Sequence, residues 1–151
     1  MAELKTPSDL KYTKNDEWLK IEGDTATIGI SDYAQDALND IVYVEFPDAG
    51  ATFKQGATFG VVESVKAASD VFMPIGGTVT EVNKALEDTP ETINTDPYGQ
   101  GWLIKIKPSD MSELESLMTK KEYEEFLAAS EEEEETDKKG KDEDVDEDDF
   151  V

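Results

Sequence analysis

The sequence contains no cysteine, no histidine and no arginine, and all fourteen of its basic residues are lysine. Without cysteine there is no disulfide framework and no thiol nucleophile. Without histidine there is no Ser-His-Asp triad, and the usual zinc ligands are missing. Without arginine there is no bidentate donor for phosphate or guanine. These absences argue against most enzyme classes, although chemistry based on carboxylates or lysine stays open.

Long apolar runs are absent as well. No stretch of the sequence is long and apolar enough to span a bilayer. The N-terminal MAELKTPSDLKYT lacks the apolar centre of a signal peptide and the arginines of a transit peptide. We therefore expect a cytoplasmic protein, or a mitochondrial matrix protein if a leader has been removed.

Positive charge is scarce, and the formal net charge is −23. Nucleic acid and anionic membranes are therefore poor partners, because both require clustered positive charge. The charge favours docking on basic patches of other proteins. At 151 residues and 37% hydrophobic, the chain is long enough for one modest core, which predicts one domain.

The acidic residues are concentrated at the C-terminal end. Residues 131–151 hold thirteen acidic residues and three lysines with almost nothing apolar, which predicts a disordered tail after a folded domain of residues 1–130. Alternating aspartates from Asp142 to Asp148 resemble the start of an EF-hand loop. Position six would be Glu147 instead of glycine, and the chain ends before position twelve, so we expect no metal site.

The first 130 residues read as short strands that are rich in Val, Ile, Thr and aromatic residues and are separated by glycine and proline. Such spacing predicts a mostly β fold, either a sandwich or a flattened barrel. The expected strands are Trp18–Glu22, Thr25–Ile30, Ile41–Phe46, Thr58–Val65, Val71–Met73, Thr78–Asn83 and Trp102–Lys107.

Helices are expected in two regions. Ser31 can cap a short internal helix. Near the C-terminal end, two patterns resemble capping boxes, Ser112 with Glu115 and Thr119 with Glu122. Three apolar side chains at helical spacing follow the second box, and we expect them to pack on the sheet: Tyr123, Phe126 and Leu127.

The two arms Thr58–Val65 and Val71–Met73 lie close enough to pair as a hairpin. The connection then falls on residues 66–70 and places Lys66 at an exposed tip with small neighbours. A modifying enzyme could reach this amine, although a surface lysine is more often a solubilising charge. Strand alternation in the first arm would put four side chains on one face: Phe59, Val61, Glu63 and Val65.

Three long blocks carry a resemblance to a known family. The segment GVVESVKAASDVFMPIGG resembles the lipoyl-lysine segment of the glycine cleavage system H proteins. ATIGISDYAQDALNDIVYVEFPDAG resembles the region before it in that family, and VTEVNKALEDTPETINTDPYGQGWLIKIKPSDMSELESLM resembles the region after it. The similarity covers about residues 10–129, and several blocks in the right order are far more specific than a lone VKA.

The resemblance implies a flattened β-barrel or sandwich hybrid of the lipoyl-domain type, with a short internal helix and C-terminal helices. It implies that lipoate is attached in amide linkage to Lys66. The arm would carry the aminomethyl group from glycine decarboxylase to the aminomethyltransferase and be reoxidised by dihydrolipoyl dehydrogenase. The chain would thus be a carrier without catalytic residues of its own, modified by a lipoate-attaching enzyme.

Three carboxylates are assigned by the same resemblance. Glu63 matches the glutamate of the family's ESVKA motif, which implies recognition by the lipoate-attaching enzyme; the alternative is an ordinary strand residue. Glu17 and Asp70 match carboxylates that face the cleft for the loaded arm, where they would favour a cationic amine. The alternatives are a solvated charge for Glu17 and a turn residue for Asp70.

Some further residues concern backbone geometry or depart from the family pattern. Gly56, Gly60 and Gly77 flank the hairpin and are expected to permit turns or close strand approach. Asp16 stands where the family commonly has histidine, and Gly76 stands where serine is usual.

Three alternatives to glycine cleavage stay open. A lipoylated relative acting in lipoate relay or another sulfur pathway would share every motif above. A biotin carrier would share the hairpin, but such domains resemble Met-Lys-Met at the tip, whereas this chain has Val65-Lys66-Ala67. An unmodified acidic interaction protein would use Lys66 only as a surface charge.

Overall fold

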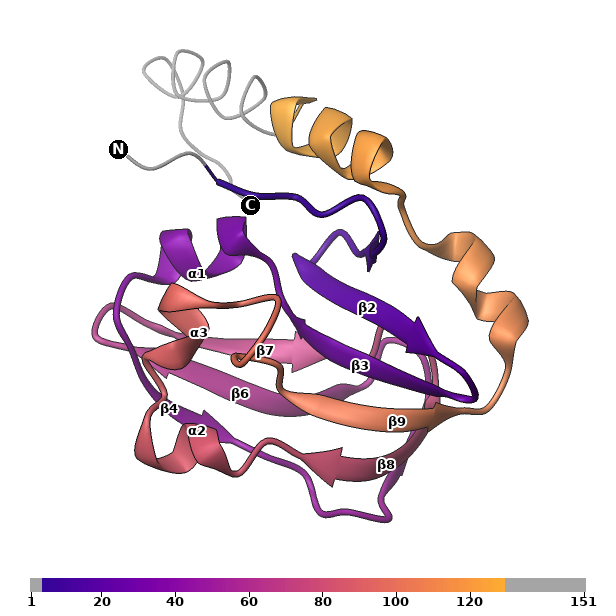
Figure 1. Ribbon diagram of the computed structural model, residues 1–151, viewed down its shortest axis with the longest axis horizontal. Coiled ribbons are helices and arrows are strands. Elements are labelled where there is room, and N and C mark those ends of the chain that lie inside the picture. The colour runs from indigo at the N-terminus through magenta and orange to yellow at the C-terminus, as the bar shows by residue number, and fades with distance from the viewer. Residues whose placement is uncertain (1–3, 130–151) are drawn as a thin grey trace, which may run out of the picture.

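The structure is a computed structural model that describes residues 4–129 (Figure 1). The acidic segment 131–151, expected to be disordered, lies outside the described residues. Within residues 4–129 the strands are β1 (Lys11–Tyr12), β2 (Glu17–Glu22), β3 (Thr25–Ile30), β4 (Ile41–Glu45), β5 (Thr52–Phe53), β6 (Thr58–Ser64), β7 (Ala68–Phe72), β8 (Gly77–Val82) and β9 (Ile104–Pro108). The helices are α1 (Asp32–Leu38), α2 (Ala85–Asp88), α3 (Thr92–Thr95), a 3₁₀ helix η1 (Met111–Ser116), and a C-terminal helix from residue 120 through the last described residue.

The strands form two antiparallel sheets that are not closed into a barrel. The larger sheet has the order β1-β2-β3-β9-β8-β5, and the smaller has the order β4-β6-β7 (Figure 1). Alternation in β2 and β3 pairs Leu19 with Ile28 on the inner face, and both are buried in the main core. The predicted mostly β sandwich with a short internal helix and C-terminal helices is therefore confirmed.

A second cluster of buried residues lies on the outer face of the larger sheet. Tyr123 of the C-terminal helix stacks on Tyr12 with ring centroids 4.6 Å apart, and Trp18 lies beside them. The Trp18 ring lies over Gly29, where a Cβ would come within 2.7 Å of it. Phe126 and Leu127 pack against this cluster, so the predicted packing of the C-terminal helix on the sheet is confirmed.

Local signals predicted several boundaries correctly. Strand β3 has the expected limits, and the Ser31 side chain caps α1 by accepting from the backbone N–H of Ala34 at 3.1 Å. The Thr119 capping box is formed, since the Thr119 backbone N–H donates to Glu122 Oε1 at 2.9 Å. The predicted box at Ser112 is wrong, because Asp110 is the cap and its carboxylate accepts from the Ser112 N–H.

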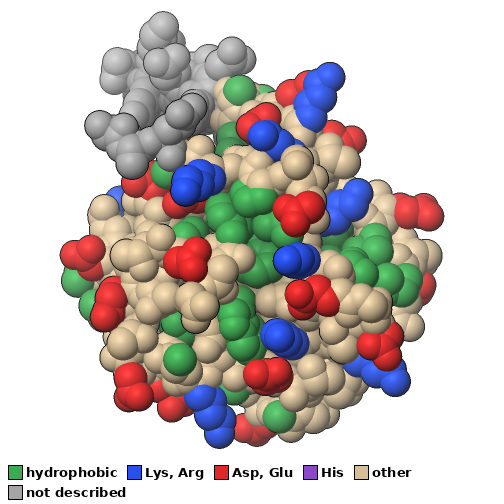
Figure 2. Space-filling view, viewed as in Figure 1, with side chains coloured by type: hydrophobic (Ala, Val, Ile, Leu, Met, Phe, Trp, Pro, Cys, Tyr) green, Lys and Arg blue, Asp and Glu red, His purple; other side chains and the backbone are tan. Residues whose placement is uncertain are grey.

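The face of the larger sheet carries charges of both signs. Figure 2 shows lysine and acidic side chains alternating over β2, β3 and β9, with apolar side chains between them. The excess of negative charge is therefore not gathered into a patch on this face. No helix among residues 4–129 combines the length and apolarity needed to cross a bilayer.

Candidate functional site

The predicted lysine lies at the tip of the β6–β7 hairpin. The last registered pair is Glu63 with Ala68, and the chain turns through residues 64–67. Ser64 fixes this turn, because its Oγ accepts from the backbone N–H groups of Lys66 at 3.1 Å and Ala67 at 3.0 Å. Lys66 is exposed, as the sequence predicts. The connection is shorter than predicted, since β7 begins at Ala68 and not at Val71.

The buried face of β6 differs from the predicted alternation. Phe59 and Val62 are the buried apolar residues of this strand, whereas Val61 is only partly buried. A β-bulge between Thr58 and Gly60 shifts the register by one residue. The expectation that Phe59 and Val61 share a face is therefore wrong, and the shift places Val61 on the outer face.

Two of the three expected glycines permit close strand approach. A Cβ at Gly60 would lie 2.5 Å from the carbonyl oxygen of Glu45, and one at Gly77 would lie 2.5 Å from that of Lys107. Gly56 instead has a φ of +85°, which side-chain-bearing residues adopt rarely. The expected backbone roles are confirmed, and at Gly60 the close approach brings β4 against the hairpin.

The lysine amine contacts the C-terminal end of α1. Lys66 Nζ donates to the carbonyl oxygen of Ala37 at 3.3 Å. The last carbonyls of a helix have no partner within it and carry the negative end of its dipole, so they attract a cation. The unmodified side chain therefore bends toward α1.

A cleft of about 150 Å³ opens next to this contact. Its walls come from the loop before β2, from α1, and from β6 and β7, and Ala37 is among them. Glu17 and Asp70 both line the cleft, so the structure brings together two of the three predicted carboxylates. Glu63 does not line it and lies on the outer face of the smaller sheet, where it pairs with Tyr43 of β4.

Glu17 is buried, with 1% of its surface exposed, so it is not the solvated charge that was the alternative. Its carboxylate accepts from Thr13 Oγ1 at 2.6 Å and from the backbone N–H of Phe72 at 2.9 Å. Burial raises the pKa of Glu17 to about 7 against the opposing effect of these two hydrogen bonds, and the nearby Asp16 carboxylate also raises it. Near neutral pH this carboxyl is therefore poised between its two protonation states.

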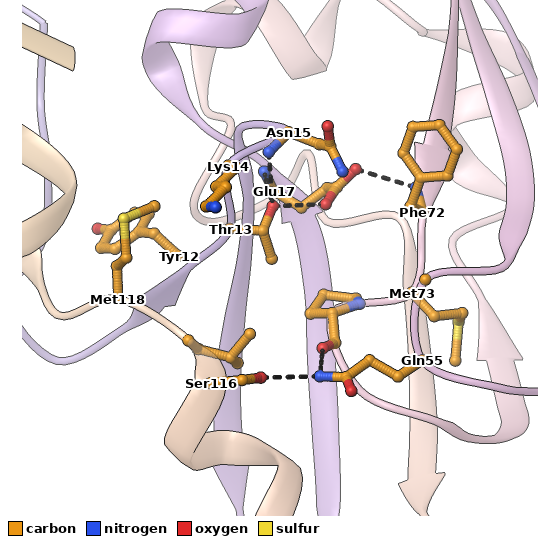
Figure 3. A pocket seen from close by; sticks show the side chains of 13 residues that line it. Tyr12, Thr13, Lys14, Asn15, Glu17, Gln55, Phe72, Met73, Ser116 and Met118 are labelled. Carbon is orange, nitrogen blue, oxygen red and sulfur yellow. Dashed lines mark hydrogen bonds between the residues drawn. The ribbon is translucent and has the colours of Figure 1, made fainter. Parts of the chain in front are cut away.

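Glu17 also separates the cleft from a second cavity. This cavity has a volume of about 230 Å³, and its walls include Thr13, Met73 and Met118 (Figure 3). Figure 3 shows the Glu17 carboxylate between Thr13 and the backbone of Phe72. The carboxylate therefore links the larger sheet to the end of β7.

Asp70 lies in a different environment. It belongs to β7, where it pairs with Val61, and it is not the turn residue that was the alternative. Its side chain is exposed, and none of residues 4–129 donates a hydrogen bond to its carboxylate. The cleft thus offers the buried carboxylate of Glu17 and the solvated one of Asp70, and Asp16 lines it as well.

A hydrogen-bond network at the wall of the cleft, which includes the lining residue Asp16, was not predicted from the sequence. Asp16 has a φ of 69°, and its carboxylate accepts from the Tyr123 hydroxyl at 2.8 Å. The same hydroxyl lies 2.8 Å from Ser31 Oγ, the cap of α1. Asp16, one of the two residues that depart from the family pattern, is thus held by Tyr123. The other, Gly76, lies away from the cleft and donates its N–H to Glu113.

Comparison with known proteins shows the family of this chain. The family model described as "Glycine cleavage H-protein" matches residues 10–130. The chain belongs to the glycine cleavage H-protein family. Glycine cleavage system H proteins of Halothermothrix orenii and Thermus thermophilus are 52% and 53% identical to it, over 82% and 80% of this chain and 97% and 94% of theirs.

A solved structure supports the same family. The crystal structure of a glycine cleavage system H protein from Mycobacterium marinum superposes with a TM-score of 0.70 and 38% identity. The match covers 82% of this chain and 98% of that one. The fold is therefore that of an H protein.

Proposed function

We propose that this chain is the lipoyl carrier of a glycine cleavage system, with lipoate in amide linkage to Lys66. One observation carries the proposal above all. The exposed lysine of the hairpin tip lies beside a cleft that holds both carboxylates assigned to the loaded arm, Glu17 and Asp70. A lysine that serves only solubility requires neither a fixed turn nor such a cleft.

The cleft residues fit the proposed group. Apolar side chains of β3, α1 and β7 line it together with the carboxylates, which suits an alkyl chain with a polar end: Ile30, Ala34, Leu38 and Val71. When attached, lipoate would supply the dithiol–disulfide couple that a chain without cysteine lacks. This couple would allow the transfer of an aminomethyl group from glycine decarboxylase to the aminomethyltransferase. Dihydrolipoyl dehydrogenase would then reoxidise the dithiol.

Acylation would change the contacts of Lys66. Its amine is a cation held at the C-terminal end of α1. An amide is neutral, so it loses the attraction to the helix dipole and leaves the tip without this tether. The turn itself depends on Ser64 and not on the amine, so it stays fixed.

The two carboxylates would hold a cationic amine in the cleft. Such a charge within a few ångströms of Glu17 lowers the pKa of its carboxyl and favours the ionised form. The buried position strengthens this attraction, because the surroundings of Glu17 exclude water. Asp70 would contribute from the solvated side, and the chain would act as a carrier and not as a catalyst.

The test is acylation followed by loading. The protein is incubated with a lipoate ligase, lipoate and ATP, and its intact mass and modified peptide are measured. We expect one lipoyl increment on Lys66 and none on the Lys66→Arg variant, which keeps the charge and melts at the same temperature within about 1 °C. Acylation of that variant at another lysine would refute the assignment.

A second step separates glycine cleavage from lipoate relay. Glycine decarboxylase and glycine are added to the acylated carrier, and the thiols that form are counted. Reduction that depends on glycine supports the carrier role. Acylated carrier that stays oxidised would exclude glycine cleavage and leave the relay.

A further inference from the structure

Exposed apolar side chains gather around the hairpin tip. Of the five large hydrophobic side chains that are exposed among residues 4–129, the three most exposed are Val65 (68%), Val42 (51%) and Tyr43 (50%). Val65 precedes the lysine and donates its N–H to the carbonyl oxygen of Asp40, directly before β4. Val42 and Tyr43 belong to β4 itself.

The exposure of two successive β4 residues has a structural cause. A β-bulge between Ile41 and Tyr43 breaks the alternation, so Val42 and Tyr43 both reach solvent. Strand β4 is an edge of the smaller sheet. The Tyr43 hydroxyl forms no hydrogen bond with any of residues 4–129. Apolar surface without a partner inside the molecule indicates a contact with another one.

The same face carries unpaired negative charge. The register places Tyr43 beside Glu63, and Glu45 beside Val61. Cross-strand partners share a face, so the carboxylates of Glu45 and Glu63 lie on the same face as Tyr43. No hydrogen bond or ion pair from the described part of the chain reaches any of these carboxylates. A partner for this face needs apolar and basic side chains together.

We propose that the enzyme that acylates Lys66 docks on this face. The docking face consists of Val42, Tyr43, Glu45, Glu63 and Val65. This inference rests on the proposed function and adds the surface that the modifying enzyme contacts. An active site that closes on Lys66 Nζ must cover Val65, its neighbour in the chain, and Tyr43 lies on the adjoining strand.

The chemistry at the tip is an acyl transfer. The unprotonated amine attacks the carbonyl carbon of an adenylated lipoate, an amide bond forms, and the bond to AMP breaks. AMP leaves with the electron pair of that bond, the nitrogen releases a proton, and nothing is oxidised or reduced. The docking face takes no part in this step and holds the carrier against the enzyme.

The test compares Tyr43→Ser with a matched control. Met111→Ser removes another exposed hydrophobic side chain, 46% exposed, from η1. The hairpin tip lies at the left of Figure 1 and η1 at the right, so the control is remote from the lysine. Initial rates of acylation are measured by mass over a series of carrier concentrations, and binding to the ligase is measured by calorimetry.

We expect Tyr43→Ser to lower kcat/KM for acylation about tenfold through KM, and to weaken binding by the same factor, because truncating a central aromatic contact has effects of this size. Glu45→Gln should reduce the dependence of the rate on salt. Met111→Ser should match the wild type, and all variants should melt alike.

Three results would overturn the inference. If the wild type is acylated at Lys66 and Tyr43→Ser is acylated equally well, the docking face is wrong while the carrier function stands. If Tyr43→Ser is acylated normally but its loading by glycine decarboxylase fails, the face serves a different enzyme. If the wild type itself is not acylated, the proposed function fails and this inference fails with it.

Discussion

The buried carboxylate of Glu17 predicts an unusual dependence of stability on pH. Its pKa in the folded protein is about 7, against an ordinary value of 4.5. A carboxyl whose folded pKa is raised binds its proton more tightly in the folded state than in the unfolded one. Its contribution to stability is therefore complete below pH 4.5 and is lost as the pH rises through 7.

The size of this effect on stability follows from the difference between the folded and the unfolded pKa of Glu17. The difference between about 7 and 4.5 corresponds to about 3 kcal/mol of unfolding free energy, and it accumulates between these two pH values. The pKa of Asp16 is also raised by burial, so this carboxyl contributes with the same sign. The chain has no histidine, so few other groups titrate between pH 5 and 8.

Urea denaturation of the unmodified protein from pH 5 to 8 measures this effect. We expect the unfolding free energy of the wild type to fall with rising pH, and that of Glu17→Gln to fall about 2.5 kcal/mol less over this range. Glu45→Gln, which removes an exposed carboxylate, controls for the loss of one negative charge. Parallel profiles for wild type and Glu17→Gln would refute the assignment of a raised pKa to Glu17.

Two further substitutions test the surroundings of the site. Gly60→Ala places a Cβ 2.5 Å from the Glu45 carbonyl oxygen and should cost about 2 kcal/mol or more of unfolding free energy; an unchanged urea midpoint would contradict this close approach. Tyr123→Phe keeps the ring but removes the hydrogen bond to Asp16, so we expect a loss of about 1–2 kcal/mol. The same substitution should raise the pKa of Asp16 further, because that bond lowers it; NMR titration would test this, and an unchanged value would show that the bond is absent.

Features with strong local signals could be predicted from the sequence. Strand β3 alternates apolar and small residues between turn signals, and Ser31 stands directly before the apolar face of α1. The limits of β7 could not be predicted in the same way. Ala68, Ser69 and Asp70 have low β propensity, and they are extended because β6 pairs with them.

The candidate site was predicted in part, because its residues meet only through long-range contacts. The exposure of Lys66 follows from its place in a turn. The burial of Glu17 does not follow from its neighbours, since its carboxylate meets the backbone of Phe72, 55 residues further on. The Asp16 network spans 107 residues to Tyr123, and nothing near Asp16 in the sequence indicates that contact. The Glu17 contact depends on how the two sheets pack, and the Asp16 contact depends on how the C-terminal helix packs on the larger sheet, so neither follows from a local pattern.

The buried position of Glu17 itself bears on the cargo of the cleft. A glutamine could accept the hydrogen bond from the Phe72 amide without the cost of burying a charge. A carboxylate adds a charge that forms when a cation enters the cleft. With a pKa of about 7, the empty site is about half protonated near neutral pH, and an ammonium group would draw it into the ionised form. Glu17→Gln should thus be acylated normally at Lys66 but hold a cationic cargo less tightly, a difference that a neutral cargo would not produce.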